Sequence, residues 1–324
     1  MNRFVLIAMA SVALLGTTLG LAQAADFPER PVRLIVPFAP GGGLDGAMRV
    51  VQPEVTRRLG QQLIIENKAG AGGALGAEFV SRSAPDGYTL LVYASTATID
   101  PSFRPNLPYS FSRDFEPVSM VERTPLFIVA NPNFPPKTVA ELIALAKQQP
   151  GKINYGSSGV GAIAHLAVEL LKSQAGIEMT HIPYDGSGPA TAAVVGGEVQ
   201  FFVQSALQIK ELASAGKLRV IAVTTRERSS IFPDVPTVGE SGLPGYEVDS
   251  WVSIFAPKGT PGAVIATLQK AFSDAARTPA TAKVLTDNGM QAVGGTADEL
   301  RAQIAAEIPM WAKLIKEGGI KLAP

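Results

Sequence analysis

The chain has 324 residues, of which 46% are hydrophobic, and its 28 lysines and arginines balance its 28 aspartates and glutamates. This composition excludes a disordered chain, and a neutral chain lacks the basic face that a nucleic-acid partner normally requires. The absence of cysteine excludes disulfides, thiolate metal sites, cysteine nucleophiles and a lipoprotein anchor, while two histidines, His165 and His181, are too few for a histidine-rich metal site.

Residues 1–24 have the pattern of a secretory signal peptide. Arg3 supplies a positive charge, residues 5–16 form an apolar run, and Ala22-Gln23-Ala24 is a small-x-small cleavage signal. An uncleaved membrane anchor is the alternative, because residues 4–21 are nearly long enough to span a bilayer. A serine, two threonines and two glycines dilute this run. We therefore predict cleavage and export, which in a Gram-negative cell means the periplasm.

From residue 31 onward, one module recurs four times: an apolar strand, a loop rich in glycine, serine or proline, and a helix with apolar residues three and four apart. In chain order, the copies are strand 32–36, loop PFAPGGG and helix 44–59; strand 63–65, loop NKAGAGG and helix 74–83; strand 152–155, loop GSSGVG and helix 162–174; and strand 179–182, loop PYDGSG and a short helix that begins at Pro189. Pro53 predicts a kink in the first helix, and Gly60 is suited to end it. Proline is favoured at a first helical position, because its missing N–H would be unpaired there anyway.

The remaining elements extend this alternation. Strands are predicted at 88–93, 199–203 and 218–224, and helices at 207–215, 261–277 and 297–317. Thr296 and Glu299 have the spacing of a capping box for the last helix. Strands that alternate with helices argue for parallel sheets covered on both faces, so we predict an α/β protein of two similar lobes, each a mostly parallel sheet flanked by helices.

Two crossings between the lobes are predicted. The proline-rich, extended segment 122–138, ERTPLFIVANPNFPPKT, is the candidate for the first, and the second is expected near 249–251. Lobe 1 would comprise residues 25–124 and 251–324, and lobe 2 residues 125–250. The two C-terminal helices would then pack back on lobe 1.

The glycine-rich loops follow the carboxyl ends of strands, where open α/β sheets bind ligands. Each loop leads into a helix N-terminus, whose free N–H groups favour an anion. One such loop is often only a turn, but four in register predict a cleft with two loops from each lobe facing one another. Lys68 is the only cationic residue in the four loops, so a carboxylate suits them better than a phosphate.

Four side chains near the loops have a structural explanation as well as a binding one. Asp45 could cap the first helix or contact the ligand or a water. Ser157 and Ser158 could cap the third helix or offer hydroxyls to a ligand. For His165 a packed core position is favoured over a ligand contact, and His181, within a strand, is expected to be structural.

Two enzyme classes were weighed against a binding protein. Gly70-x-Gly72-x-x-x-Gly76 imitates a dinucleotide fingerprint, but the acid expected after the next strand is missing, because that strand ends Tyr93-Ala94-Ser95. The stretch 156–160, GSSGV, has the setting of a serine-hydrolase elbow but the wrong spacing. We therefore expect a binding protein with no metal and no cofactor.

An ordered set of stretches covers nearly the whole mature chain and resembles the Bug/TctC family, the extracytoplasmic solute receptors of tripartite tricarboxylate transporters. Among them are PVRLIVPFAPGGGLD, LIIENKAGAGGALGAEFV, APDGYTLL, HIPYDGSGPA and FPDVPTVGESGLPGYEVDSWVSIFAPKGTP. The resemblance implies a two-lobed periplasmic-binding-protein fold of type II, closure of the lobes around a small organic carboxylate, and a membrane permease as partner. A ligand sensor that feeds a two-component kinase is the alternative function.

The resemblance also implies which residues hold the ligand. In the family, the loops after the first two strands hold one carboxylate, and lobe 2 adds a Ser/Gly loop and a Tyr-x-Gly turn. With the candidates above, the predicted ligand-binding residues are Phe38, Pro40, Gly41, Gly42, Gly43, Asp45, Gly70, Ala71, Gly72, Gly73, Thr96, Ser157, Ser158, Gly159, His165, Tyr184, Asp185, Gly186 and Gln204. The family commonly has Lys or Arg at the position of Asp185, which would repel a second carboxylate. We therefore expect the far end of the ligand to be neutral or to carry an amine.

Overall fold

The structure is a computed structural model that describes residues 27–321. The predicted signal peptide, residues 1–24, lies outside the described residues. Within residues 27–321, no helix combines the length and the apolar character needed to cross a bilayer.

Strands and helices alternate along the chain, as the module pattern predicted. In order they are β1 (Val32–Val36), α1 (Gly43–Leu59), β2 (Leu63–Asn67), the short 3-10 helix η1 (Ala71–Gly73), α2 (Ala74–Ser81), β3 (Thr89–Ala94), α3 (Thr96–Phe103), β4 (Phe115–Ala130), α4 (Val139–Gln148), β5 (Asn154–Ser157), α5 (Ile163–Ala175), β6 (Thr180–Pro183), α6 (Ser187–Gly196), β7 (Phe201–Ser205), α7 (Ala206–Ser214), β8 (Arg219–Val223), β9 (Asp249–Pro257), α8 (Gly262–Ala276), α9 (Pro279–Asp287), β10 (Gln291–Ala292) and α10 (Ala297–Glu317). The prediction that α6 begins at Pro189 is wrong, because the helix begins two residues earlier. Proline is tolerated at its third position for the reason given above: the first N–H groups of a helix have no partner within it.

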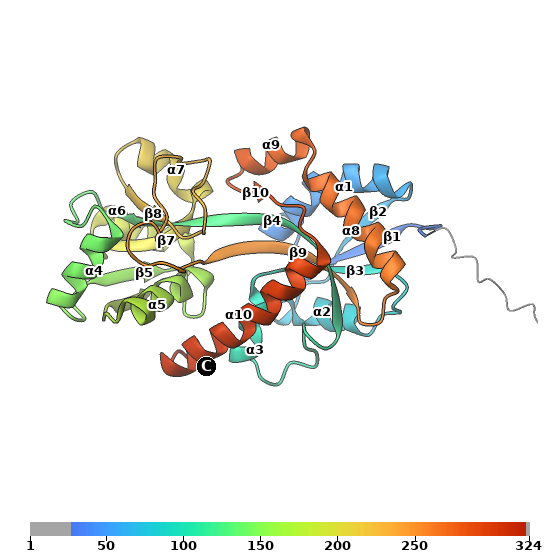
Figure 1. Cartoon of the computed structure of the whole chain (residues 1–324), viewed down its shortest axis with the longest axis horizontal. Coiled ribbons are helices and arrows are strands. Elements are labelled where there is room, and N and C mark those ends of the chain that lie inside the picture. The colour runs from blue at the N-terminus through green and yellow to red at the C-terminus, as the bar shows by residue number, and fades with distance from the viewer. Residues whose placement is uncertain (1–26, 322–324) are drawn as a thin grey trace, which may run out of the picture.

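Two bodies, which we call lobe 1 and lobe 2, share one sheet (Figure 1). Its strand order is β2-β1-β3-β9-β4-β7-β5-β6, and β8 and β10 also pair with β4. In lobe 1, β1 pairs in parallel with β2 and β3, and in lobe 2, β5 pairs in parallel with β6 and β7. The long strand β4 runs through both lobes, and β9 pairs antiparallel with it from the junction, at Asp249, into lobe 1. The predicted two-lobed α/β fold is therefore confirmed, with antiparallel pairing where the strands cross.

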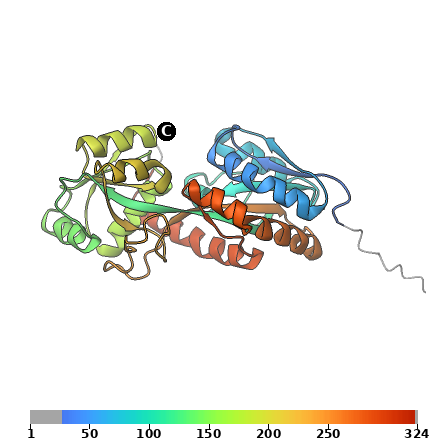
Figure 2. The same ribbon diagram turned by 90° about the horizontal axis from the view of Figure 1, so that it is seen from above.

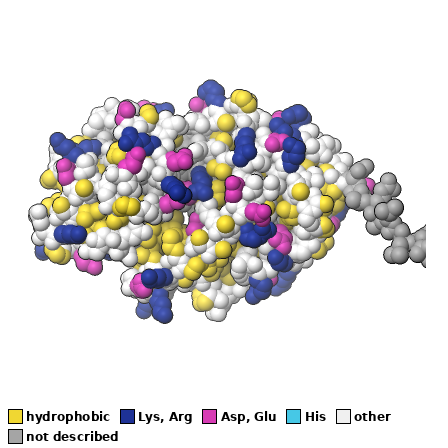
Figure 3. Space-filling model, viewed as in Figure 1, with side chains coloured by type: hydrophobic (Ala, Val, Ile, Leu, Met, Phe, Trp, Pro, Cys, Tyr) yellow, Lys and Arg dark blue, Asp and Glu magenta, His cyan; other side chains and the backbone are white. Residues whose placement is uncertain are grey.

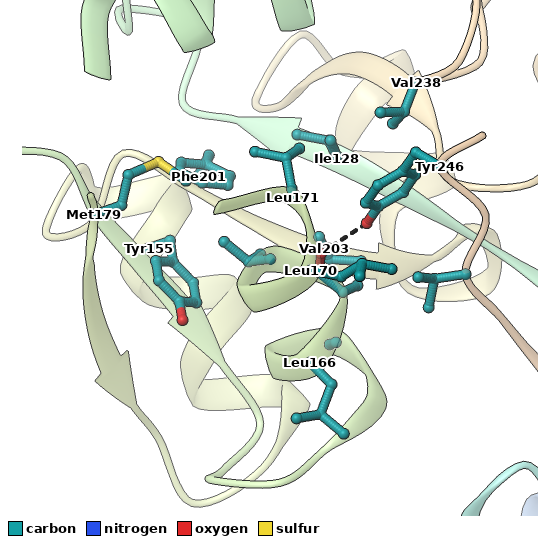
Figure 4. Close-up of a cluster of buried hydrophobic side chains, with 14 of the residues drawn as sticks. Ile128, Tyr155, Leu166, Leu170, Leu171, Met179, Phe201, Val203, Val238 and Tyr246 are labelled. Atoms are coloured by element: carbon teal, nitrogen blue, oxygen red, sulfur yellow. Dashed lines mark hydrogen bonds between the residues drawn. The ribbon is translucent and has the colours of Figure 1, made fainter. Parts of the chain in front are cut away.

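The side chains of both lobes pack into separate cores. In lobe 2, apolar residues of β4, β5, β7 and α5 surround Tyr246, whose hydroxyl donates to the carbonyl of Ala167 at 2.7 Å (Figure 4). In lobe 1, buried residues of β1, β3 and β9 pack against α1 and α8. Burial of such side chains from water is the main favourable term in folding, so each lobe has its own source of stability.

The last helix, α10, joins the two cores. Thr296 and Glu299 form the predicted capping box at its start. Leu300 and Ile304 pack in a lobe 1 cluster, whereas Trp311 and Leu314 pack in the lobe 2 cluster. Figure 2 shows this helix lying along the junction of the two bodies. The prediction that it packs back on lobe 1 therefore holds only for its first half.

Candidate functional site

The loop after β1 is held by Asp45. Its buried carboxylate accepts hydrogen bonds from the backbone N–H of Gly41 at 2.9 Å and from the amide of Asn67 at 3.1 Å, and Arg49 binds both of its oxygens. Asn67 also donates to the carbonyl of Phe38 at 3.0 Å. The Arg49 guanidinium lowers the pKa of Asp45 to about 2. Asp45 is therefore a fixed anion that shapes the loop, and its oxygens are occupied by the protein itself.

The loop after β2 turns through a left-handed backbone at four successive residues. The φ angles are 144° at Gly70, 47° at Ala71, 64° at Gly72 and 95° at Gly73. Only glycine adopts such angles at little cost, and Ala71 is the one residue other than glycine with positive φ among residues 27–321. Gly73 also lies under two aromatic side chains, since a Cβ there would be 3.0 Å from both Phe38 and the hydroxyl of Tyr93. Phe38, in the loop after β1, therefore lies against Gly73 in the loop after β2.

The helices that follow the four loops begin without a side-chain cap. The residues at their N-caps are Gly42, Gly73, Ala162 and Gly186, and no side chain accepts from their first N–H groups. Threonine hydroxyls cap α4, α9 and α10, whereas α3, α7 and α8 also begin without a side-chain cap. What distinguishes α1, α2, α5 and α6 is the glycine-rich loop that precedes each of them. Uncapped N–H groups at the positive end of a helix dipole are suited to hold an anion.

Ser157 and its neighbours stabilise the loop between β5 and α5, which is the first predicted binding loop of lobe 2. The hydroxyl of Ser157 donates to the carbonyl of Gly159 at 3.0 Å, accepts from the N–H of Gly159 at 3.1 Å, and lies 2.6 Å from Nε2 of His181. Since α5 begins at Ile163 with Ala162 as its N-cap, the alternative in which Ser157 or Ser158 caps this helix is wrong. The chain needs five more residues to turn into the helix, so Ser157 braces the loop instead.

A stacked pair of histidines lies beneath the same loop. The rings of His165 and His181 are 3.8 Å apart at an interplanar angle of 11°. Nδ1 of His165 accepts from the backbone N–H of Gly161 at 3.1 Å. Burial lowers the pKa of His165 to about 4, and burial also lowers the pKa of His181. Both rings are therefore neutral at physiological pH, and His165, a predicted ligand residue, acts on the loop from within the core.

The other predicted residues lie around these loops. Pro40, Gly43 and Asp185 are exposed, Gln204 is buried, and its side-chain oxygen accepts from the N–H of Ser205 at 2.8 Å. Those that are half-buried are Phe38, Thr96, Ser158, Tyr184 and Gly186. The backbone of Tyr184 donates to the carbonyl of Ser157 at 3.0 Å, which joins the two lobe 2 loops. The loops of each lobe are thus assembled within that lobe.

Arg104, which sequence analysis missed, joins the lobe 1 loops. It follows α3, and its Nη1 donates to the carbonyl of Ala71 at 3.2 Å. Lys68, the one cation within the predicted loops, instead lies 4.4 Å from the centre of the Phe79 ring. No sequence signal within the loop could reveal Arg104, because it is 32 residues beyond Gly72 and reaches it only through the packing of α3.

A further pocket of about 430 Å³ lies where β4, β9 and α10 meet. Figure 3 shows a narrow gap between the two bodies on this face, with side chains of both charges beside it. Among the charges that line the pocket, Arg123 binds Asp249 and donates to Gln303, and Glu307 accepts from Gln303 at 2.6 Å. Arg226 also lines the pocket, is exposed, and forms no ion pair with any of residues 27–321. The pocket therefore has a free guanidinium, but none of the four predicted glycine-rich loops lines it.

Ser157 and His181 also resemble the nucleophile and base of a hydrolase. Ser157 is fully buried, however, and its hydroxyl is also within hydrogen-bond distance of the carbonyl and the N–H of Gly159. Glu169 lies 3.8 Å from Nε2 of His165 and accepts from Lys172 at 2.8 Å. A buried, hydrogen-bonded hydroxyl is poorly placed to attack a substrate. The positions of Ser157 and His181 are better suited to stabilising the loop between β5 and α5.

Two α/β lobes joined by crossing strands, with uncapped helix N-termini behind glycine-rich loops, define the class of two-lobed periplasmic solute-binding proteins. Residues 47–320 match the family described as the tripartite tricarboxylate transporter family receptor, TctC, and the chain belongs to this family. It is 37% identical to the protein BugT of Bordetella pertussis over 319 residues, which are 97% of this chain and 98% of BugT.

Three solved structures are similar over most of the chain. A TctC solute-binding protein from Polaromonas without ligand is 29% identical, with a TM-score of 0.83, over 90% of this chain and 99% of the other. Rpa4515 of R. palustris with adipate is 32% identical, with a TM-score of 0.72, over 92% and 100%. MatC of Rhodopseudomonas palustris with bound malate is 33% identical, with a TM-score of 0.68, over 89% and 100%.

Proposed function

We propose that this protein captures a small carboxylate-bearing metabolite between its lobes in the periplasm and delivers it to the permease of a tripartite tricarboxylate transporter. The observation that carries the proposal is the presence, after parallel strands in both lobes, of glycine-rich loops that lead into helices without a side-chain cap. The proposal includes the cleaved signal peptide at residues 1–24. It also includes the predicted lobe limits, with residues 25–124 and 251–324 in lobe 1 and residues 125–250 in lobe 2.

The chemistry of the loops supports a carboxylate as the bound group. Backbone N–H groups bind an anion without a side-chain charge, and the two structures named with ligands hold adipate and malate, both of which are dicarboxylates. In this chain, Asp185 is exposed at the lobe 2 turn. Its charge opposes a second carboxylate, so we propose a ligand whose far end is neutral or carries an amine.

Closure of the lobes would complete the site. The described arrangement is more similar to the unliganded Polaromonas protein than to the proteins with adipate or malate, although the identity to the unliganded protein is lower. This supports an open form in which the loops of the two lobes are still apart. Hinge closure would then remove water from the carboxylate and strengthen its hydrogen bonds.

Gly72→Asp tests the proposed site. The backbone of Gly72 has a φ of 64°, and a Cβ there would be 2.6 Å from the guanidinium nitrogens of Arg104. The new carboxylate would therefore occupy the anion site itself, and we expect binding to be lost. Gly151→Asp is the matched control, because Gly151 has a φ of 72° and nothing within 4 Å of a Cβ.

The measurement is native mass spectrometry of each purified variant, followed by calorimetry with a panel of mono- and dicarboxylates. We expect the wild type and the Gly151 variant to retain the same ligand and the Gly72 variant to be empty but folded. Unchanged affinity in the Gly72 variant would place the site elsewhere. Tight binding of citrate to the wild type would contradict the proposed neutral or amine-bearing far end.

A further inference from the structure

We propose that Arg104 is the charged anchor of the ligand carboxylate and thereby determines the specificity of the lobe 1 half of the site for acids over their amides. This inference rests on the proposed function, which places the carboxylate at the glycine loop. It adds a side chain, from an element that the loops do not contain, to a site otherwise built of backbone N–H groups.

The guanidinium of Arg104 covers Gly72. A Cβ on that glycine would be 2.6 Å from both Nη1 and Nη2 and 3.0 Å from Cζ, so the flat group lies directly over the backbone of the loop. Its Nη1 holds the loop through the carbonyl of Ala71 at 3.2 Å. Glycine at position 72 thus serves two purposes, since it adopts a left-handed φ and leaves room for the arginine.

Most of the donors of Arg104 are unused. A guanidinium has five N–H donors, and the bond to Ala71 uses one of them. Within residues 27–321, Arg104 forms no ion pair, and the neighbouring Asp100 accepts instead from the hydroxyl of Tyr93 at 3.1 Å. A half-buried guanidinium with free donors is available to an anion, and closure of the lobes would bury it further and make an anionic partner more favourable.

The other cations near the lobe 1 loops are committed to protein partners. Arg49 binds both oxygens of Asp45, and Lys68 lies over the ring of Phe79. Arg33 binds both oxygens of Glu66. A ligand carboxylate above the glycine loop would therefore meet Arg104 as its counter-ion. Arginine pairs with a carboxylate through two parallel hydrogen bonds, which lysine cannot reproduce.

Nuclear magnetic resonance with acetate as the probe tests this inference without knowledge of the natural ligand. The Nε–H signal of Arg104 is assigned by its loss in Arg104→Lys, and it is followed together with the backbone amides of residues 70–73. We expect both to shift in a saturable way with acetate and neither to shift with acetamide. In Arg104→Gln, the glycine amides should need about tenfold more acetate, because a charge-assisted pair is lost.

Arg82→Gln is the matched control, since Arg82 lies at the other end of α2 and pairs with Glu78 on the surface. It removes the same charge and should leave the acetate response unchanged. If the glycine amides respond equally in the wild type and in Arg104→Gln, the anchor is refuted while the proposed function stands. If neither Arg104 nor the glycine amides respond to acetate, the carboxylate site and the anchor both fail.

Discussion

At the scale of single residues, the partners of Asp45 explain why a negatively charged side chain can lie beside a predicted anion site. A carboxylate beside a predicted anion site should repel the ligand, but Arg49 neutralises it and Gly41 and Asn67 occupy its oxygens. Its carboxylate therefore stabilises the loop from Phe38 to Gly43 and is not directed at the ligand. A residue that is buried and fully bonded in this way positions the site and is costly to change.

Asp45→Asn is expected to lower the free energy of unfolding by about 1 to 3 kcal/mol at pH 7, because it leaves donors without their charged acceptor. The pKa of Asp45 is lowered to about 2 from an ordinary value of 3.8. This contribution is therefore fully present above about pH 4 and is lost as the pH falls toward 2. Urea unfolding should show the difference between variant and wild type shrinking below pH 4.

Asp287→Asn is the control for this experiment. Asp287 pairs with Lys283 on an exposed part of α9, one turn apart like Asp45 and Arg49. An exposed pair of this kind contributes less than about 0.5 kcal/mol. Equal losses in the two variants would show that Asp45 has no special role in the loop.

The glycine loops could be predicted from the sequence and Arg104 could not, for a physical reason. The glycines in a run such as AGAGG indicate from the sequence alone that the backbone can adopt a positive φ, because few other residues tolerate it. A guanidinium that reaches the loop from residue 104 depends on how α3 packs against β3 and α10, and packing is set by the whole lobe. The same holds for Ser157, for which capping a helix and contacting the ligand were both open, and whose hydroxyl lies beside His181.

At the scale of elements, the short strands of the repeated module were easier to predict than the long crossing strands and the short helices. Apolar β-branched runs marked β1, β5 and β7 to within two residues at each end. The prediction missed α3, whose sequence TATIDPSF contains β-branched residues and a proline, and it missed α4, α9 and the two-residue strand β10. It also missed the strands β4 and β9, because it treated parts of both only as extended crossings between the lobes. Short helices such as α3 are marginal alone and form because neighbouring elements cover them.

The loop between β5 and α5 is the element for which a pH effect is expected. His165 on α5 and His181 on β6 stack beneath it, with Tyr155, Glu169 and Lys172 around them. Since burial lowers the pKa of His165 to about 4 from an ordinary 6.5, the neutral ring is the form that the fold stabilises. That stability is present above about pH 6.5 and is lost as the pH falls toward 4.

His165→Asn keeps an acceptor for the N–H of Gly161 and removes the titration. Between pH 6.5 and 4, we expect the wild type to lose roughly 2 kcal/mol more unfolding free energy than the variant does. Urea unfolding at several pH values measures this difference. The contributions of carboxylates that titrate in both proteins cancel when the two unfolding free energies are subtracted. Parallel pH profiles for the two proteins would refute the role of the histidine pair.

At the scale of the whole molecule, the junction consists of three segments. Strand β4 pairs with β9 as far as Pro125 and Asp249, with two register shifts, and then with β7 and β8 of lobe 2. Helix α10 packs on both cores. Arg123 on β4 binds Asp249 at the start of β9 and donates to Gln303 of α10 at 2.6 Å. A hinge of paired strands bends without breaking its hydrogen bonds, and each lobe keeps its own core as it moves. The fold therefore permits closure without local unfolding.

Small-angle X-ray scattering of the ligand-free and loaded protein tests this closure directly. If the described arrangement is the open form, loading should reduce the radius of gyration by on the order of 1 Å, because hinge closure brings two rigid bodies together. The retained ligand identified by mass spectrometry serves as the probe, after removal by partial unfolding and refolding. Gly72→Asp should keep the ligand-free radius of gyration at every ligand concentration.

A wild type that binds the ligand by calorimetry without becoming more compact would show that binding and closure are separate. The loops of lobe 1 would then hold the carboxylate without lobe 2.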